Sequence, residues 1–383
     1  MQFLCLSSAA MQVAMMLTCA AACANEPQEK TGAAADAVPT VTITRTRDPV
    51  DKSYRKMLKG MDLFENKRSM APHASLRYKL LPRQRDTNMD GIVLRIVGDS
   101  VTIPVPVAPD HTFTLERHQQ ALDEDASVMP NRKTHSMTWR TEIRTPGLPP
   151  PIRRLGDLRL ECQVGIEADL ISNYLPVIGQ VAHFLQKMLD YCNGSEVHYL
   201  FFSERPLFGV TMVAGTRREI LPVNELYAGA SHRPMSKADL SSCDCQVLLD
   251  RTYFLPLGDR SWPDDTRIEF EYMDDENEHQ RAATIPAQDA MHAITIGKST
   301  KVDVLAALGN TPVISFDSGF EVWVYRYAGD TPAKAGAVER NERAGSGNAT
   351  LGLSEFVLLF APSGIVAKIR IRPAPPPGQT KGS

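Results

Sequence analysis

The sequence GKSTKVDVLAALGNTP, residues 297–312, contains the start and stop signals of one short helix. Thr300 can cap the helix because its hydroxyl accepts a hydrogen bond from a free backbone N–H, and Asp303 completes a reciprocal capping box. Gly309 favours the positive φ that ends a helix, and Pro312 prevents the helix from resuming. The expected apolar face consists of Val304, Leu305 and Leu308.

The residues around this helix predict a small two-layer domain over 288–373. The sequence AQDAMHAI at 287–294 indicates a second short helix, and Gly297 allows a bend between the two. Three strand patterns follow in meander order: FEVWVYRY (320–327), EFVLLFA (355–361) and IVAKIRIR (365–372). We therefore expect two helices packed on a three-stranded antiparallel sheet, with Trp323 and Tyr325 in the core.

These residues resemble the SmpA/OmlA family, which includes the small lipoprotein E subunit of the bacterial outer-membrane β-barrel assembly machine. The resemblance spans 288–373, and it implies a domain that binds proteins in outer-membrane assembly or integrity. The matching features are Gly297 and Thr300 before the helix, Leu308, Gly309 and Pro312 at its end, Trp323 and Tyr325 in the aromatic strand, and Ser363-Gly364 before the last strand.

Two features depart from the family pattern. One extra residue lies between Gly297 and Thr300, and the loop over 328–351 is longer than the family's and contains the low-complexity sequence AGSGNAT. The same layout of helices and sheet occurs in secreted β-lactamase-inhibitor proteins. The layout alone therefore implies a protein-binding surface and not one particular process.

Basic residues alternate along the last strand. Ile365, Ala367, Ile369 and Ile371 are expected to face the helices, so Lys368, Arg370 and Arg372 share the opposite face. On an exported protein, such a basic strip is suited to contact anionic lipid headgroups or a partner protein. The alternative is a solvated strand face whose charges protect a sheet edge.

The first 24 residues are typical of an export signal. The stretch FLCLSSAAMQVAMMLTCAAACA is uncharged, and the small residues Ala22 and Ala24 precede a cut before Asn25. It lacks the Lys or Arg that usually comes first, and its apolar part is too short and too alanine-rich for a membrane span of about 20 residues. We expect a mature chain without a transmembrane span, in the periplasm or on the periplasmic face of the outer membrane.

A second cleavage site would change how the protein is anchored. The sequence AAAC, ending at Cys23, is similar to a bacterial lipoprotein signal, in which that cysteine becomes the lipidated first residue. The alternative is that Cys23 belongs to a discarded peptide. The sequence leaves both open.

Four cysteines remain after the export signal: Cys162, Cys192, Cys243 and Cys245. An even number in an oxidising compartment favours disulfides, and four cysteines allow three pairings. A bridge inside the Cys-Asp-Cys sequence closes a strained ring. We therefore expect Cys162 and Cys192 to pair with Cys243 and Cys245.

The remaining chain predicts an α+β protein in several regions. Residues 25–38 have the composition of a flexible tether and 374–383 that of a disordered tail. Short strand patterns, including SLRYKLL (75–81), VTIPVPV (101–107) and SMTWRTEI (136–143), predict a β-rich, sandwich-like domain over 39–150. The prolines in VTIPVPV favour an edge strand.

The middle region, 151–283, has a mixed pattern. In LRLECQVGIEADL (158–170) apolar and polar residues alternate, which predicts a strand with one buried and one wet face. The apolar spacing then lengthens to three and four residues, which indicates a long helix over about 175–191. Further strands are expected at 197–202, 209–214, 246–256 and 267–273.

The sequence gives few signs of chemistry. Asp86, Asn88 and Asp90 match the first half of a calcium loop, but a turn between strands accounts for them equally well. No nucleophile elbow, phosphate loop or dinucleotide motif is present. The net charge of −3 gives no electrostatic basis for binding nucleic acid. We expect no cofactor and no catalytic site.

Three functions are consistent with these patterns. The first is an exported, outer-membrane-associated protein or lipoprotein that binds outer-membrane assembly proteins or anionic lipid. The second is a soluble periplasmic binding or inhibitor module. The third is a hydrolase whose site lies within residues 40–280, and a pocket that joins two titratable groups would favour it.

Overall fold

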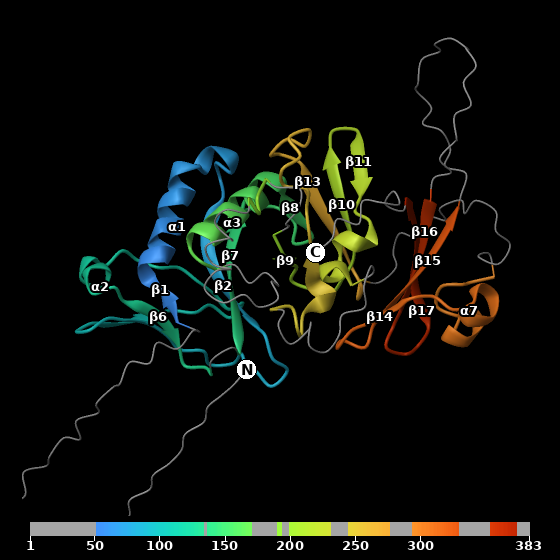
Figure 1. The fold of residues 1–383 in the computed structure, drawn as a ribbon, viewed down its shortest axis with the longest axis horizontal. Coiled ribbons are helices and arrows are strands. Elements are labelled where there is room, and N and C mark those ends of the chain that lie inside the picture. The colour runs from blue at the N-terminus through green and yellow to red at the C-terminus, as the bar shows by residue number, and fades with distance from the viewer. Residues whose placement is uncertain are drawn as a thin grey trace, which may run out of the picture. The chain divides into compact units, whose positions relative to one another are not determined.

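The computed structural model describes a mixed α and β protein in which strands predominate (Figure 1). The described residues contain four α-helices, and all their strand pairings are antiparallel. The described ranges are 51–133, 136–170, 190–193, 199–230, 244–275, 293–328 and 353–373. Several predictions concern residues outside these ranges: the export signal with Cys23, the tether, Cys243, the tail, and nearly all of the helices expected at 175–191 and 287–294.

Two sheets and a helix build the first core. One sheet has the order β1-β6-β3-β4, and the other has the order β5-β2-β7. Their bounds are β1 (Lys52–Ser53), β2 (Ser75–Pro82), β3 (Leu94–Val97), β4 (Thr102–Val105), β5 (Thr112–Phe113), β6 (Ser127–Pro130) and β7 (Met137–Arg144). Tyr78 and Trp139 from one sheet pack in the same core as Leu94 and Val128 from the other. The strand at 101–107 is an edge strand, as its prolines predicted.

The sequence analysis missed helix α1 (Tyr54–Asn66), which precedes β2. The hydroxyl of Ser53 caps it by accepting a hydrogen bond from the backbone N–H of Lys56 at 3.4 Å. Its buried residues recur at helical spacing: Tyr54, Met57, Leu58 and Phe64. The short helix α2 (Gln119–Asp123) lies before β6.

The stretch expected to be a strand over 158–170 is instead helix α3 (Leu155–Glu167). Ten of its 13 residues are buried. Leu160 and Val164 pack with α1 and β7, while Leu158 and Cys162 join a second core. The prediction was wrong because Arg159 and Glu161, which lie between the apolar residues, are buried and do not face water.

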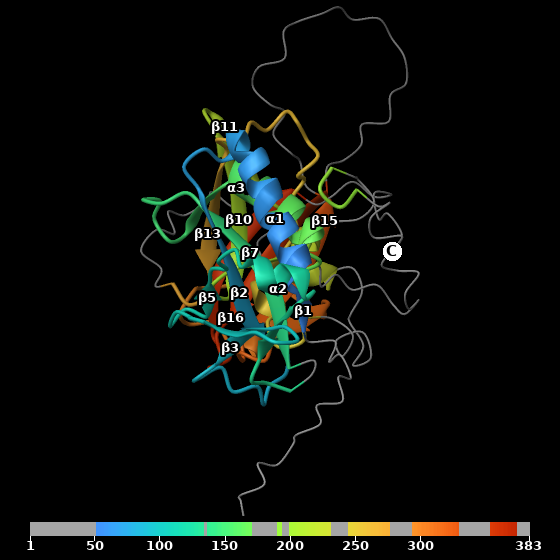
Figure 2. The ribbon, with the colours of Figure 1, turned by 90° about the vertical axis from the view of Figure 1, so that its left-hand side faces the viewer.

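Close packing holds α3 against α1. The two helices lie side by side in both ribbon views (Figures 1 and 2). Gly60 of α1 allows this approach, because a Cβ atom there would lie 2.9 Å from Cβ of Ala168. A larger residue at this position would push the helices apart.

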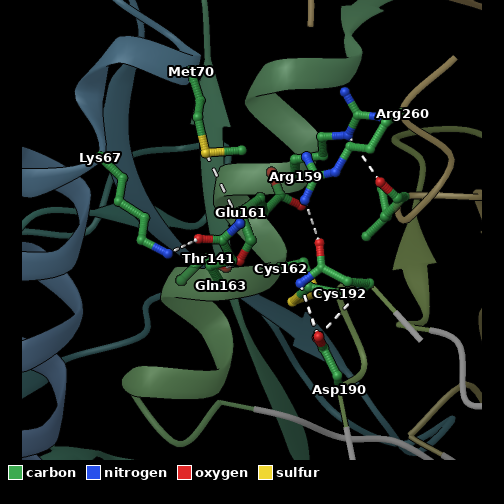
Figure 3. Close-up of a disulfide and its surroundings, with 12 residues drawn as sticks. Lys67, Met70, Thr141, Arg159, Glu161, Cys162, Gln163, Asp190, Cys192 and Arg260 are labelled. Atoms are coloured by element: carbon green, nitrogen blue, oxygen red, sulfur yellow. Dashed lines mark hydrogen bonds between the residues drawn. A yellow bond between two sulfur atoms is a disulfide. The ribbon is translucent and has the colours of Figure 1, made fainter. Parts of the chain in front are cut away.

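A disulfide joins α3 to the turn at 191–193. Cys162 is bonded to Cys192, with the two Cα atoms 5.9 Å apart (Figure 3). The predicted pairing of these two cysteines with Cys243 and Cys245 was therefore wrong. Cys245 is also disulfide-bonded. The prediction failed because it placed Cys162 on a strand, whereas the helix turns this side chain toward residue 192.

The second core lies between two further sheets. The middle sheet has the order β11-β10-β13-β8, and β12 pairs with β9 beside it. The bounds are β8 (Ile152–Arg154), β9 (Phe201–Phe202), β10 (Leu207–Ala214), β11 (Arg217–Ile220), β12 (Thr252–Tyr253) and β13 (Arg267–Tyr272). The strand predicted at 246–256 is mostly absent, since Leu249–Arg251 form a 3-10 turn.

The C-terminal sheet has four strands, one more than predicted. Its order is β14-β15-β16-β17, and the additional strand is the three-residue β14. The bounds are β14 (Val313–Ser315), β15 (Glu321–Ala328), β16 (Leu353–Phe360) and β17 (Val366–Pro373). Helix α7 (Lys301–Leu308) has the expected capping box between Thr300 and Asp303, and Gly309 follows it with a φ of 76°. Leu305 was expected to be buried, but it is 40% exposed.

Both faces of this sheet are covered. Trp323, Phe356 and Leu358 pack in one core with Val304 of α7, and Tyr325 packs against that core. Val324 and Leu359, on the other face, join the second core, which also holds residues of β10 and β13. The second core therefore contains residues from both the predicted middle region and the predicted C-terminal domain.

This arrangement corrects the prediction for the basic strip. Lys368 and Arg372 are only 3% and 1% exposed, so they do not form a solvated or lipid-facing surface. The Lys368 ammonium donates to the carbonyl oxygen of Tyr272 at 2.7 Å, and Arg372 donates to that of Leu221 at 2.9 Å. Arg370 forms a salt bridge with Glu271 of β13. The strip contacts the middle sheet because that sheet covers its face.

Burial changes the acid–base properties of the strip. It lowers the pKa of Lys368 and of Arg372, and it lowers that of Arg370 to about 10. Gly209 of β10 leaves room for Arg370, because a Cβ there would lie 2.5 Å from one of its guanidinium nitrogens. The strip is therefore buried between two sheets at a desolvation cost, which its hydrogen bonds and the salt bridge to Glu271 partly offset.

We predict that Glu271→Ala destabilises the protein. The substitution removes the carboxylate that faces Lys368 and Arg370, and leaving two such cations without it lowers the free energy of unfolding by about 1–3 kcal/mol. Urea denaturation followed by circular dichroism measures the change. The matched control is Glu219→Ala, an exposed glutamate of β11, for which a change within about 0.5 kcal/mol is expected. Equal effects of the two substitutions would contradict the packing role.

Candidate functional site

The clearest cavity in the described structure has a volume of about 500 Å³. Strands β2 and β7 form one wall, and residues 199–204, which include β9, form another. Arg251 and the loop at 109–111 complete its lining. The volume is within the range typical of pockets for small organic ligands.

A network of charges covers the strand wall of the cavity. Glu142 of β7 lies 3.5 Å from the ammonium of Lys79 and 3.1 Å from the guanidinium of Arg144. Arg144 also lies 2.6 Å from Glu204. Burial opposes ionisation of Glu142, but these cations outweigh it and hold the pKa of the carboxyl below its usual value.

Arg153 and Glu161 form a second charge pair in the lining of the cavity. Glu161 of α3 accepts hydrogen bonds from Arg153 at 2.7 Å and from the backbone N–H of Ile143 at 3.0 Å. Both charged residues are almost fully buried. Burial raises the pKa of Glu161, although Arg153 favours its ionised form. The pair anchors α3 and β8 to β7.

Arg140 differs from the other cations of the cavity. It lies opposite Lys79 in the β2–β7 pairing, and only 5% of it is exposed. None of its three guanidinium nitrogens makes a hydrogen bond, and all three are inaccessible to solvent. Its guanidinium carbon lies 4.5 Å from the centre of the Phe202 ring and 6.0 Å from that of Tyr199.

Tyr199 stands beside Arg140 in the same cavity. Its hydroxyl is buried beside Arg140 and Thr141, whose side chains are near enough to lower its pKa but lie outside ordinary hydrogen-bond geometry. Burial raises the pKa of Tyr199, so the hydroxyl keeps its proton and can donate it. The cavity therefore combines an unpaired cation with an unused hydroxyl.

The loop at 86–91 has the contacts of a turn. The side-chain oxygen of Asn88 accepts a hydrogen bond from the backbone N–H of Asp90 at 2.7 Å. The guanidinium of Arg132 donates to the carbonyl oxygen of Asn88 at 2.7 Å, which places a positive charge beside the loop. These contacts support the turn and not the calcium reading of Asp86, Asn88 and Asp90. The described residues also contain no group of three His, Cys, Asp or Glu side chains able to hold a metal ion.

The sequence analysis did not single out the cavity residues. The pattern SMTWRTEI predicted a strand over 136–143 but no role for Arg140, and Tyr199 and Phe202 were given no role either. Arg140 and Phe202 are distant in the chain, so no local pattern relates them. The nearest signal was the charged alternation in TWRTEIR, which does not indicate what covers that face.

Comparison with protein-family models, curated proteins and solved structures finds no match to this chain. The resemblance of 288–373 to the SmpA/OmlA family therefore stays a prediction. In the part of the chain that the structure describes, no helix combines the length and apolar character needed to cross a bilayer.

We predict that Glu142→Gln changes how stability depends on pH. The pKa of Glu142 is lower in the folded protein than its unfolded value of about 4.3. The carboxylate therefore contributes stability above about pH 4.3, and the contribution is lost as the pH falls through the folded-state pKa. We expect the variant to be less stable than wild type by about 1–3 kcal/mol near neutral pH, with a smaller difference in acid.

Urea denaturation between about pH 7 and pH 3 measures this difference. Glu219→Gln, on exposed strand β11, is the control and should follow the wild-type curve. A difference between Glu142→Gln and wild type that does not change with pH would contradict the assignment.

Proposed function

We propose that this is an exported cell-envelope protein that acts by binding. The observation that carries the proposal is the Cys162–Cys192 disulfide. It lies in the second core, together with Leu158 of α3 and residues of two sheets. Disulfides form and persist in oxidising compartments and are rare in the cytosol. The disulfide and the export pattern of residues 1–24 therefore favour the same compartment.

Within this proposal, the soluble binding module takes precedence over the membrane-contact function. The cavity beside Arg140 offers a binding site, whereas the basic strip is used inside the protein. Docking of the C-terminal domain on outer-membrane assembly proteins stays a proposal that rests on the family resemblance. Helix α7 leaves Val302 73% exposed and Leu305 40% exposed, and these are the apolar residues such a contact would use.

A second candidate function is hydrolysis of an ester in the same cavity. Two carboxyl groups of its lining, Glu142 and Glu161, have pKa values shifted in opposite directions, as in acid–base pairs of hydrolases. Water would add to the ester carbonyl, Glu142 would accept the water proton, and Glu161 would donate a proton to the leaving oxygen as the C–O bond breaks. The salt bridge to Arg153 favours the ionised form of Glu161, which cannot donate a proton. This function therefore ranks second.

The hydrolase function predicts turnover of 4-nitrophenyl acetate that Glu161→Gln abolishes. Wild-type activity should follow a bell-shaped pH profile set by the two carboxyl groups. Release of nitrophenol is measured by absorbance, and circular dichroism shows whether the variant is folded. Equal rates for wild type and a folded variant would exclude the function.

The export proposal predicts a processed and oxidised mature chain. We expect protein expressed in a Gram-negative host to begin at Asn25, or at an acylated Cys23, and to fractionate with the envelope. Intact-mass and non-reducing peptide mass spectrometry measure both the N-terminus and the Cys162–Cys192 link. A cytosolic chain that keeps Met1 and reduced cysteines would overturn the proposal.

The form of the N-terminus also separates the two envelope functions. Cleavage before Asn25 favours a soluble binding module, whereas an acylated Cys23 favours a protein anchored at the outer membrane. Crosslinking in the envelope followed by copurification then tests for barrel-assembly components. Their absence from the crosslinked material would count against the outer-membrane function.

A further inference from the structure

The cavity beside Arg140 has unused hydrogen-bond donors. They are the three guanidinium nitrogens of Arg140 and the Nε atoms of Arg153 and Arg251, and each nitrogen can only donate. The hydroxyl of Tyr199 can donate as well. Among the described residues, the buried carboxylate and amide oxygens that make no hydrogen bond lie elsewhere, on Asn224, Glu271 and Glu355, and that of Glu271 is in a salt bridge with Arg370. A ligand that completes the hydrogen bonding of this cavity must therefore supply acceptors.

The charges of the lining lead to the same requirement. Glu142, Glu161 and Glu204 each form a salt bridge with an arginine other than Arg140. The remaining carboxylate, Asp110, accepts hydrogen bonds from the backbone and hydroxyl of its neighbour Thr112 at 3.1 and 2.6 Å. Arg251 of the lining donates to the carbonyl oxygen of Glu204 at 2.8 Å, whereas Arg140 has neither a salt bridge nor a hydrogen bond of ordinary geometry among the described residues.

Stacking on aromatic rings does not remove this requirement. The Phe202 ring lies 4.5 Å from the guanidinium carbon of Arg140, and such a contact contributes about 0.5–2 kcal/mol. A stacked ring engages the face of the guanidinium, whereas its N–H groups point outward in the plane. These groups still lack acceptors, and burying a cation without hydrogen bonds costs several kcal/mol.

We infer that this cavity binds a small organic oxyanion, with its carboxylate or phosphate group on the guanidinium of Arg140. The inference deepens the proposed binding function and rests on it. A planar guanidinium with free in-plane N–H groups is suited to two parallel hydrogen bonds with a carboxylate or phosphate. Tyr199 supplies a further donor beside it.

The cavity has room for more than the anionic group. Its volume of about 500 Å³ exceeds what a single carboxylate or phosphate fills, and apolar side chains of Leu81, Met89 and Phe202 contribute to the lining. A ligand with an aromatic or aliphatic body would cover these side chains, which are only partly buried. The ligand class is therefore an organic acid or a phosphate monoester.

The test uses probe compounds that share one aromatic body. Benzoate and phenyl phosphate carry the two anionic groups, benzylamine carries a positive charge, and benzyl alcohol is neutral. Inorganic phosphate tests the head group alone. Isothermal titration calorimetry and thermal unfolding are measured on the oxidised, mature protein in a phosphate-free buffer of low ionic strength. We expect benzoate or phenyl phosphate to bind and to raise the melting temperature, and benzylamine to do neither.

Variants then assign the binding to Arg140. In Arg140→Met we expect the affinity for the anionic probe to fall roughly tenfold or more, because the charged hydrogen bonds are lost. In Arg140→Lys the charge remains without the planar fork, so an intermediate loss is expected. Arg95→Met, which removes an exposed arginine of β3, is the matched control and should bind like wild type.

Stability of the ligand-free variants separates a ligand role from a structural one. Removing an uncompensated buried charge should leave Arg140→Met at least as stable as wild type. A less stable Arg140→Met protein would indicate that Arg140 has a partner in the fold, and it would overturn the inference. The inference is also overturned if neither benzoate nor phenyl phosphate binds at millimolar concentration, or if Arg140→Met binds them like wild type.

The outcomes distinguish this inference from the proposed function. Binding of benzyl alcohol or benzylamine in the cavity, without binding of the anions, would overturn the oxyanion ligand but leave a binding protein. Anion binding by a chain that is neither exported nor oxidised would support the site and overturn the envelope location.

Discussion

The fold depends on one constraint: ten of the 13 residues of helix α3 are buried, so the buried polar side chains Asp157, Arg159 and Glu161 need partners inside the protein. Asp157 accepts from Thr145 after β7, Arg159 donates to Asp264 before β13, and Glu161 pairs with Arg153 of β8. Removing one partner of such a buried pair costs about 3–5 kcal/mol. One helix therefore fixes the positions of three segments from two sheets, and the two cores cannot form independently around it.

The same constraint explains why the sequence misled us at this helix. Alternation of apolar and polar residues indicates a strand only when the polar residues face water, and in α3 they face buried partners. The amino-acid composition of this stretch favoured a helix instead, since Leu, Arg, Glu and Gln favour helices and β-branched residues are few between Leu155 and Glu167. Helix α1 was missed although Ser53 and the spacing of its apolar residues marked it. Periodicity identifies the faces of an element, but it does not identify what covers them.

The C-terminal region shows which features local sequence signals can predict. Local signals were sufficient for α7, because capping by Thr300 and the positive φ of Gly309 depend on neighbours in the chain. The three long strands were predictable from alternation, and β17 does place Lys368 and Arg372 on one face. The packing of this face against β13 is tertiary structure, which local patterns do not predict. The strip expected to contact lipid is therefore buried. Disulfide pairing failed similarly, since it requires the backbone to be known first.

Arg140 differs from the other buried arginines in its polar contacts. Arg370 and Arg372 also have buried nitrogens without partners, but each forms at least one polar contact, to Glu271 and to Leu221 respectively. Arg140 lies beside the Tyr199 hydroxyl but has no salt bridge or hydrogen bond of ordinary geometry among the described residues, and it lies on a cavity wall. Glu161 of α3 pairs with Arg153 of β8, and no salt bridge joins it to Arg140. The interaction that organises the core thus leaves one cation available to a ligand.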